Sequence, residues 1–395
     1  MDLRYSDSDE KFRGELRSWL EENVPAHGDP PRADDWEARR AYDTSWQHKL
    51  YRAGYACINW PKEFGGRDAS PTEELVYYEE IGRAKAPYVG INFVGVKHGG
   101  PTLIAEGTPE QKARHIPQIL RGEQTWCQGF SEPSAGSDLA SLRTSAVRDG
   151  DHYVVNGHKI WTTYAQVADY CELLVRTDPD VRKHAGISWL IMPMNLPGVE
   201  IRPLKTLVGE GEFSEVFLED VRVPVENRVG EENDGWRVTN VTFRFERGTA
   251  FAGAIYAQQE FLADLVQLAR GLERGGTLMW ESEALRAEVG HLKAELDSLW
   301  AMVKMGVSEV NAAGVPGLGG AVVKLLYAEL DQRLGDLAIR LLGRAGLSRD
   351  DLAGLPSKRF LAVALKSLNL TIAAGTSQIQ RNIIAERILG LPKDR

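Results

Sequence analysis

Two short stretches of the sequence combine residue types that could hold a polar, planar ligand. Residues 129–138 read Gly-Phe-Ser-Glu-Pro-Ser-Ala-Gly-Ser-Asp, so hydroxyls, glycines and a proline share one turn whose exposed N–H groups can cradle a pyrophosphate. Residues 156–163 place Trp161 before Thr162 and Thr163, an arrangement in which the indole stacks on a ring system and the hydroxyls bond its heteroatoms. On composition alone, the first stretch is more typical of an ordinary surface loop, and Trp161 of a tryptophan in a barrel core.

A β-rich region must position both stretches. Between residues 123 and 232, short runs of β-branched and aromatic residues alternate with turn signals. The dipeptides Asp149-Gly150 and Asn156-Gly157 lie between such runs, and both are typical of tight hairpins. Several short strands joined in this way predict a small antiparallel barrel or sandwich.

Helical periodicity occupies the two flanking regions. After residue 232, amphipathic segments are expected over about 236–271, 280–312, 319–343 and 357–388. Helices of that length must bury apolar stripes against one another, so they predict a bundle. The sequence therefore predicts a multidomain α+β protein with an N-terminal helical domain (1–122), a middle antiparallel β-barrel or sandwich domain (123–232) and a C-terminal four-helix bundle (233–395).

Composition and charge exclude several classes of protein. The 395 residues include 47 lysines and arginines against 56 aspartates and glutamates, a net charge of −9, without a basic stripe suited to nucleic acid. No segment approaches the ~18–20 apolar residues of a membrane span, and the N-terminus has no signal-peptide pattern. The three cysteines and eight histidines lack the spacing of a metal site, so no metal is expected, and the cytoplasm is the default compartment.

The two ligand-binding stretches, taken together, indicate a known family. In order and spacing they resemble the flavin-binding signatures of the acyl-CoA dehydrogenase family. Residues 131–138 are similar to its S/T-E-P-x-A-G-S-D segment, and residues 156–163 to its N-G-x-K-x-W-(I/T)-T segment. Further matches at residues 60–66, 107–123 and 375–385 extend the resemblance over nearly the whole chain. The family's domain order is the one predicted above.

Through this resemblance the cofactor is FAD, lying between the β domain and the bundle, with a neighbouring subunit completing the pocket. The backbone of Phe130 and Ser131 is expected to contact the isoalloxazine ring. Trp161 packs on that ring, and Thr162 and Thr163 accompany it, with Thr163 bonding near N5.

Further contacts follow from the same resemblance. Gly136 and Ser137 are expected beside the flavin and the incoming thioester arm, so Ser137 also contacts substrate. Thr376 and Gln378 reach the phosphates and the adenosine end of FAD. A helix N-terminus beginning at Gly375 also suits an anion there.

The reaction that the family implies needs one strong base. Dehydrogenation of an acyl thioester removes a proton from the α carbon while a hydride leaves the β carbon for flavin N5, and a desolvated carboxylate suits proton removal near neutral pH. In many members this glutamate directly precedes the C-terminal G-T. Here that position is Ala374, whose backbone N–H can still bind the thioester oxygen. A minority of members carry the base on a bundle helix, and there the resemblance places Glu246, followed by Arg247 on the CoA side. The alternative is that Glu246 and Arg247 are an exposed charged pair on a helix.

Two motifs of the family are altered. Its R-x-(Q/T)-F-G-x-x-(L/I) segment, which contacts FAD across a subunit interface, corresponds to residues 274–281, where the R-x-x-F-G pattern is absent. Its Q-x-x-G-G-x-G segment becomes residues 340–346. We expect Arg340 and Gly343 to contact the cofactor there, with Arg340 and Arg344 substituting for lost phosphate contacts.

These departures leave three hypotheses open. The first is a homo-oligomer, a dimer or tetramer, that works in fatty acid or lipid β-oxidation, oxidises an acyl-CoA to the trans-2-enoyl-CoA and passes electrons to an electron-transfer flavoprotein. The second is one subunit of a hetero-oligomer in which a related partner completes the FAD site. The third is a flavin oxidase or an inactive member on the same fold. A base on the bundle helix is associated with branched or bulky acyl groups, including sterol side chains.

Overall fold

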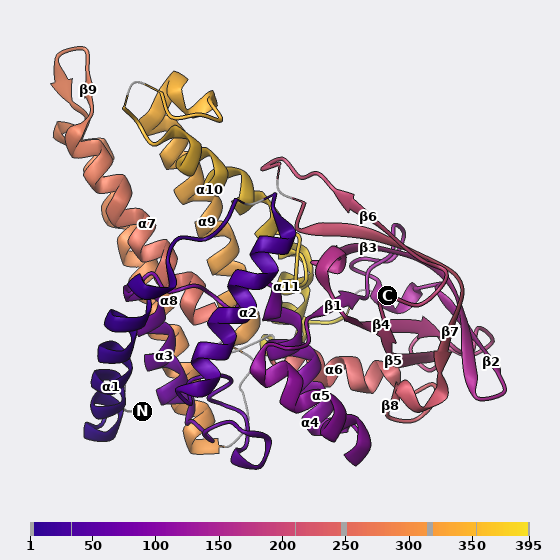
Figure 1. Ribbon diagram of the computed structural model, residues 1–395. Helices are drawn as coiled ribbons and strands as arrows, with labels where there is room; N and C mark the ends of the chain where they lie inside the picture. The colour runs from indigo at the N-terminus through magenta and orange to yellow at the C-terminus, as the bar shows by residue number, and fades with distance from the viewer. Residues whose placement is uncertain are drawn as a thin grey trace. The chain divides into compact units, whose positions relative to one another are not determined.

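The computed structural model describes residues 4–32, 34–209, 211–245, 251–313, 319–352 and 354–393 (Figure 1). The chain divides into two compact units. A helical unit comprises Met1–Ser18, Pro71–Ala84 and Arg247–Arg395, and a second unit, which holds the main β-sheet, comprises Trp19–Ser70 and Lys85–Glu246.

The main sheet defines the β domain of the second unit. Its strands are β1 (Trp126–Gly129), β2 (Ser145–Asp149), β3 (His152–Thr163), β4 (Tyr170–Arg176), β5 (Ile187–Pro193), β6 (Val199–Leu204), β7 (Phe213–Pro224) and β8 (Arg228–Val229). Hydrogen bonds order them β6-β7-β3-β2-β4-β5-β8, with β1 beside β4. Most neighbours are antiparallel, whereas β4 runs parallel to β1 and to β2. The expected β domain is confirmed, and two parallel pairings join its antiparallel ones.

The two dipeptides that predicted hairpins behave differently. Asp149-Gly150 links β2 to β3, and Gly150 takes a positive φ of 63°. Asn156-Gly157 does not turn the chain: both residues lie inside β3, so that prediction is wrong. A Cβ on Gly157 would lie 2.4 Å from the hydroxyl oxygen of Thr144, so this glycine permits a close strand contact rather than a turn.

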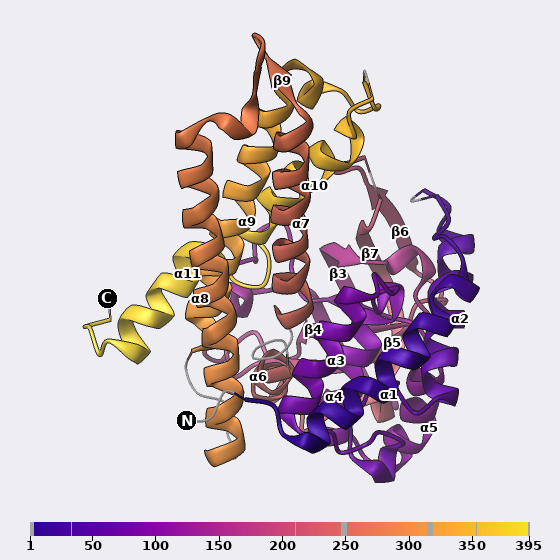
Figure 2. The ribbon, with the colours of Figure 1, turned by 90° about the vertical axis from the view of Figure 1, so that its left-hand side faces the viewer.

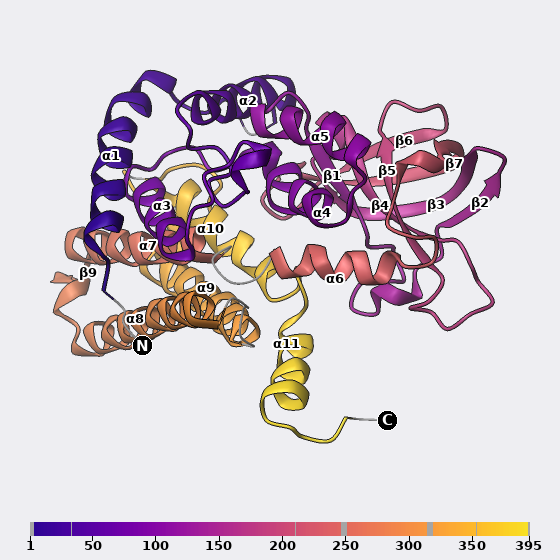
Figure 3. The same ribbon diagram turned by 90° about the horizontal axis from the view of Figure 1, so that it is seen from below.

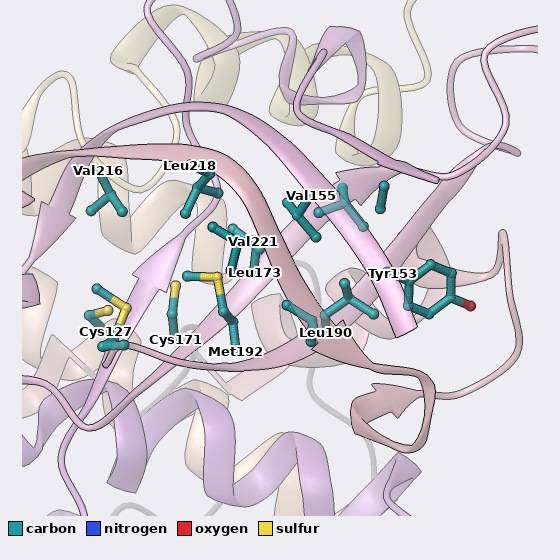
Figure 4. Packing of buried hydrophobic residues seen from close by; sticks show 14 of the residues in the cluster. Cys127, Tyr153, Val155, Cys171, Leu173, Leu190, Met192, Val216, Leu218 and Val221 are labelled. Atoms are coloured by element: carbon teal, nitrogen blue, oxygen red, sulfur yellow. The ribbon is translucent and has the colours of Figure 1, made fainter. Parts of the chain in front are cut away.

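Apolar side chains from facing strands fill the interior of the β domain. Figure 4 shows Val216 and Leu218 of β7 on one side of this core and Cys127, Cys171 and Met192 on the other. Burying side chains of this size stabilises a fold by roughly 1.5–3 kcal/mol each. The core therefore fixes β1, after which the first ligand-binding stretch continues, and β3, which contains the second.

Helices of the same unit pack around the sheet. They include α2 (Trp36–Arg52), α4 (Gly100–Glu106), α5 (Pro109–Arg121) and α6 (Gly235–Phe245). Helix α6 packs on β5 and α4 (Figure 3), and the hydroxyls of Thr242 and Thr102 meet at 2.9 Å between the two helices. Both threonines are fully buried, so this contact fixes the C-terminal part of α6 against α4.

In the described part of the helical unit, four long helices run side by side (Figure 2). These are α7 (Ala252–Gly271), α8 (Glu283–Ala313), α9 (Gly320–Leu342) and α10 (Ser357–Leu370). Helix α3 (Pro71–Arg83) packs on α7 and α8, and the beginning of α1 (Asp7–Asn23) belongs to the same unit. Leu262, Leu296 and Leu334 are among the side chains that meet in the bundle core. The expected bundle is confirmed.

The segment expected as one helix over 357–388 is broken. Helix α10 ends at Leu370, and α11 (Ser377–Ile383) follows after a turn (Figure 3). Ala374 and Gly375 in this turn have positive φ values of 52° and 83°, which a right-handed helix cannot contain. The break therefore turns Ala374 into a loop residue.

Candidate functional site

The two ligand-binding stretches are hydrogen-bonded to each other. Strand β1 ends at Gly129 and releases residues 130–138, whereas residues 161–163 form the end of β3. The N–H of Ile160 donates to the carbonyl oxygen of Ser131 at 3.0 Å. This hydrogen bond holds the two stretches side by side.

A buried ion pair fixes this junction. The Lys159 ammonium lies 2.9 Å from Oε1 of Glu132 and donates to the carbonyl oxygen of Phe130 at 3.2 Å. The Glu132 carboxylate also accepts the backbone N–H groups of Arg143 at 2.7 Å and Thr144 at 2.8 Å. Sequence reasoning assigned no role to Lys159 or Glu132, although both lie inside the two motifs and that position was the available signal.

Burial and pairing act against each other in this ion pair. Desolvation lowers the pKa of Lys159, and the nearby carboxylate opposes that change only in part. Desolvation raises the pKa of Glu132, but the lysine and the N–H donors outweigh it, so this pKa lies below its usual value. The carboxylate is therefore ionised at neutral pH, and removing the lysine would leave a buried, uncompensated charge.

Trp161 presents its indole outward from the end of β3. Its φ of 61° lies in the left-handed region, and 56 % of its surface is exposed. This local twist coincides with a shift in the pairing of β3 with β7 between Lys159 and Thr162. The ring of Phe213 meets the indole at 86° with centroids 5.9 Å apart, so it supports one side of the indole and leaves a broad aromatic surface open.

The two threonines after Trp161 differ in accessibility. Thr162 is completely buried, and its hydroxyl has no hydrogen-bond partner among the described residues. Thr163 is half-buried. Alternation along a strand explains the difference, because successive side chains point to opposite faces. Of the two hydroxyls, that of Thr163 is better placed to meet a ligand.

The rest of the first stretch offers backbone and small side chains. Gly136 and Ser137 are exposed and directly follow a turn that a pair of backbone hydrogen bonds closes between Glu132 and Ala135. Ser131 is half-buried, whereas Phe130 is buried with its ring edge-on to Phe243 of α6 at 6.2 Å. A ligand at this turn meets peptide groups and hydroxyls rather than the Phe130 ring.

In the helical unit, the C-terminal motif forms the turn between α10 and α11. Thr376 caps α11 by accepting the N–H of Ile379 at 3.1 Å. Ala374 and Gln378 are exposed. The Ala374 N–H donates to no acceptor within the described ranges of the chain. The turn therefore presents an available backbone donor beside a helix cap.

A hairpin stands where the family's R-x-x-F-G segment would be. Strands β9 (Glu273–Arg274) and β10 (Thr277–Leu278) pair antiparallel around two glycines of positive φ. Arg274 donates to the carbonyl oxygen of Leu341 at 3.1 Å. Its guanidinium also lies 2.8 Å from the place that a Cβ on Gly343 would take. The missing side chain at Gly343 therefore leaves room for the Arg274 side chain.

Arg340 forms an exposed ion pair on the surface of the bundle. Its guanidinium binds the Glu288 carboxylate of α8 through both terminal nitrogens, and this pairing raises the pKa of Arg340. The pair and Arg274 line a cavity of about 300 Å³. Both Arg340 and Arg344 are exposed, but the Arg340 guanidinium is already paired with a carboxylate.

The expected site residues therefore form three groups. Residues 130–137 and 161–163 meet in the β-containing unit. Ala374, Thr376 and Gln378 share one turn of the helical unit. Arg340 and Gly343 lie at the C-terminal end of α9. The predicted base and its neighbour, Glu246 and Arg247, lie outside the described residues.

The described residues contain neither a metal-ion site nor a membrane-spanning helix. No group of three or more His, Cys, Asp or Glu side chains there could hold a metal ion. No helix in those ranges has both the length and the apolar character needed to cross a membrane.

Models of one protein family match almost the whole chain. The N-terminal domain of acyl-CoA dehydrogenase matches residues 6–123, its middle domain residues 127–221 and its C-terminal domain residues 233–389.

Similar proteins carry the same family name. The acyl-CoA dehydrogenase IpdE1 of Mycobacterium tuberculosis is 40 % identical over 397 residues, and IpdE1 of Mycolicibacterium smegmatis is 38 % identical over 403 residues. Each alignment covers 98 % of both proteins.

Solved structures agree in fold. One chain of the ChsE4-ChsE5 complex from Mycobacterium tuberculosis has a TM-score of 0.85 at 34 % identity, and the Tcur3481-Tcur3483 steroid ACAD has a TM-score of 0.85 at 31 % identity. Both comparisons cover 100 % of each chain. The family, the three-domain fold and the expected FAD cofactor are thereby confirmed. The chain belongs to the acyl-CoA dehydrogenase family of FAD-dependent oxidoreductases.

Proposed function

We propose that this chain dehydrogenates an acyl-CoA between the α and β carbons, with Glu246 as the base. The observation that carries the proposal is the exposed indole of Trp161 beside the turn at residues 131–137, on a scaffold fixed by Lys159 and Glu132. An open aromatic surface next to peptide donors suits the ring end of FAD. FAD, when bound there, supplies the acceptor for the hydride from the β carbon.

The assignment of the base rests on α6 and on Ala374. Glu246 follows α6 directly in the sequence, and the Phe243 ring of that helix contacts Phe130 of the first ligand-binding stretch. The described end of α6 therefore packs against the ring end of the proposed site. Ala374, at the usual position of the base, has no titratable group. We assign removal of the α proton to Glu246 and a contact on the CoA side to Arg247.

Two groups of the helical unit complete the proposed roles. The Ala374 N–H, which has no acceptor among the described residues, binds the thioester carbonyl oxygen as negative charge builds on it. Thr376 and Gln378 lie at the phosphate and adenosine end of FAD. Ser137, exposed in its turn, contacts the thioester arm.

We propose a bulky, ring-containing acyl group as substrate. One similar structure is a steroid ACAD, and in the family a base at the position of Glu246 is associated with bulky acyl chains. An electron-transfer flavoprotein is the proposed acceptor of the electrons. Hydrogen peroxide formed in air without an added acceptor would instead indicate an oxidase.

We further propose that the protein works as a hetero-oligomer with a related subunit. A similar structure is the two-component ChsE4-ChsE5 complex, and in this chain Arg340 is committed to Glu288 where the family's phosphate contacts are expected. Mass and flavin content of the protein, purified alone and with its co-expressed partner, test this. A homo-oligomer with one FAD per chain would contradict it.

The decisive test of the chemistry is Glu246→Gln, which keeps shape but removes the base. Turnover of butyryl-, isovaleryl-, octanoyl- and cholanoyl-CoA is measured with a ferrocenium acceptor. With the best of these substrates we expect at least a roughly 10²-fold loss, the lower end for a positioned general base. FAD content and KM should stay close to those of the parent.

A matched control is Glu260→Gln, since Glu260 is an exposed glutamate on α7. It should turn over like the parent. The double variant Glu246→Gln/Ala374→Glu places a carboxylate at the family's usual position and is expected to recover part of the rate. Parental turnover by Glu246→Gln would refute the assignment.

A further inference from the structure

A buried lysine of the bundle contacts the turn that carries Ala374. Lys324, on the first turns of α9, is only 4 % exposed. Its ammonium donates to the carbonyl oxygen of Leu370 at 2.5 Å and to that of Gly375 at 3.0 Å. Leu370 is the last residue of α10, and Gly375 directly precedes the cap of α11. One ammonium group therefore joins the two ends of the turn.

The turn needs such an anchor because its backbone is strained. Ala374 has a φ of 52°, a left-handed conformation that a residue with a Cβ adopts only when its surroundings enforce it. Gln380 assists by donating to the carbonyl oxygen of Ala374 at 3.2 Å, and Gln332 of α9 donates to the Thr371 hydroxyl at 2.9 Å. Lys324 is the charged member of this set.

The same turn leaves one donor unused. The carbonyl of Ala374 is bound, whereas its N–H has no acceptor in the described ranges, and the residue is exposed. Because both carbonyls that Lys324 binds flank this peptide, the ammonium fixes the direction in which the N–H points. A charged donor binds a carbonyl oxygen more strongly than a neutral one does, so it suits this task.

We propose that Lys324 is a positioning residue for the reaction: it holds the turn at residues 371–375 so that the Ala374 N–H is aimed at the thioester carbonyl oxygen. This inference rests on the proposed function. Lys324 touches neither substrate nor cofactor in this scheme and acts only through the turn. Burial also lowers the pKa of Lys324 to about 8, as expected for an ammonium without a carboxylate partner among the described residues.

The test compares three substitutions with the parent. Lys324→Met removes charge and donors at similar length, Lys324→Gln keeps a neutral donor, and Lys324→Arg keeps the charge. The control is Arg333→Met, since Arg333 lies on the same helix but pairs with the exposed Glu295. For each, FAD per chain, kcat and KM with cholanoyl-CoA, and amide hydrogen exchange of residues 371–376 by mass spectrometry are measured.

We expect Lys324→Met to lower kcat per bound FAD by about tenfold, less than the 10²–10³ seen when an oxyanion donor is removed outright. KM should change by less than about threefold, because an interaction made mainly in the transition state is lost. Amide exchange at 371–376 should become faster. Lys324→Arg should recover most of kcat, and Arg333→Met should match the parent.

Several outcomes would overturn the proposal. Parental kcat in Lys324→Met, or unchanged amide exchange at 371–376, would do so. If Lys324→Met fails to fold, a kcat for Lys324→Gln equal to that of Lys324→Arg would also contradict it. If the parent oxidises none of the acyl-CoA substrates, the proposed function fails, whereas the exchange measurement still decides whether Lys324 holds the turn.

Discussion

The β domain and the bundle each place a buried lysine beneath a part of the proposed site, but the two lysines have different partners. Lys159 faces the Glu132 carboxylate at 2.9 Å and adds one carbonyl contact. Among the described residues, Lys324 donates to two carbonyl oxygens, those of Leu370 and Gly375. The first positive charge is balanced by a carboxylate within hydrogen-bond distance, whereas the second has only peptide carbonyls as partners among the described residues.

The difference separates two ways of holding a loop. The Lys159–Glu132 pair is a structural lock, because removing either member leaves an opposite charge in the interior. Lys324 leaves no buried charge behind when it is replaced, and its own ionisation is weakened by burial, which lowers its pKa to about 8. Loss of the first lysine should therefore harm the fold, and loss of the second mainly the reaction.

The largest predicted effect is on folding. Lys159→Met should lower the free energy of unfolding by about 3–5 kcal/mol, the usual result of breaking a buried ion pair from one side. Urea denaturation followed by tryptophan fluorescence measures it. Lys183→Met is the control, because Lys183 pairs with the exposed Asp138 and should cost less than about 1 kcal/mol. If the two variants lose the same free energy of unfolding, the Lys159–Glu132 pair contributes no more to stability than the exposed Lys183–Asp138 pair.

A smaller effect is expected at the exposed indole of Trp161, on the surface that the Lys159–Glu132 pair supports. Trp161→Ala should raise the Kd for FAD about tenfold, or about 1.4 kcal/mol, because stacked aromatic area is lost. The free energy of unfolding of the apoprotein should change little, since the indole is 56 % exposed. Fluorescence titration of the apoprotein with FAD measures the change. Trp161→Phe, which keeps an aromatic face, should stay within about threefold of the parent, and unchanged affinity in Trp161→Ala would exclude the stacking role.

The smallest predicted effect is on the pH dependence of stability, through the titration of Lys324. The folded-state pKa of Lys324, about 8, lies below the ordinary 10.5, so the folded protein carries a penalty for the charged ammonium at low pH. The penalty is present in full below pH 8 and is lost as pH rises through 10.5. Relative to Lys324→Met, the parent should therefore gain stability between pH 7 and pH 9.5, by about 1 kcal/mol once partial solvent screening is allowed for. Denaturation curves at both pH values check this, and a constant difference would show that Lys324 titrates normally.

Much of the fold was predictable because it depends on local patterns and on ordered motifs. The β region, the bundle and the Asp149-Gly150 turn all follow from periodicity and turn chemistry. The prediction at Asn156-Gly157 was wrong because the dipeptide was interpreted without the segment that packs against it. Its glycine is required by the close approach of Thr144, a residue on another segment. The motif at residue 375 indicated a helix start there, but the left-handed φ of Ala374 was not predicted, because alanine favours helices and this φ is imposed by tertiary contacts.

The candidate site was predictable only as a set of positions. The resemblance located Trp161 and the turn before Ser137, and the structure adds that they share a hydrogen-bonded junction. It did not give roles to Lys159 or Lys324, because a lysine in a sequence is normally solvated and only the packing shows that these two are buried. Glu246 stays a prediction from the sequence.

The thiols of the β-domain core have a practical consequence for following its motions. Cys127 and Cys171 face each other as paired residues of the parallel strands β1 and β4, with almost no exposed surface. A maleimide can reach them only when β1 and β4 come away from the core, the same strands that support the first ligand-binding stretch. Cys57, less enclosed, should react earlier, although burial raises the pKa of its thiol to about 12. The rate at which maleimide adds mass to the protein in native buffer therefore measures how often β1 and β4 open locally, without an attached reporter group.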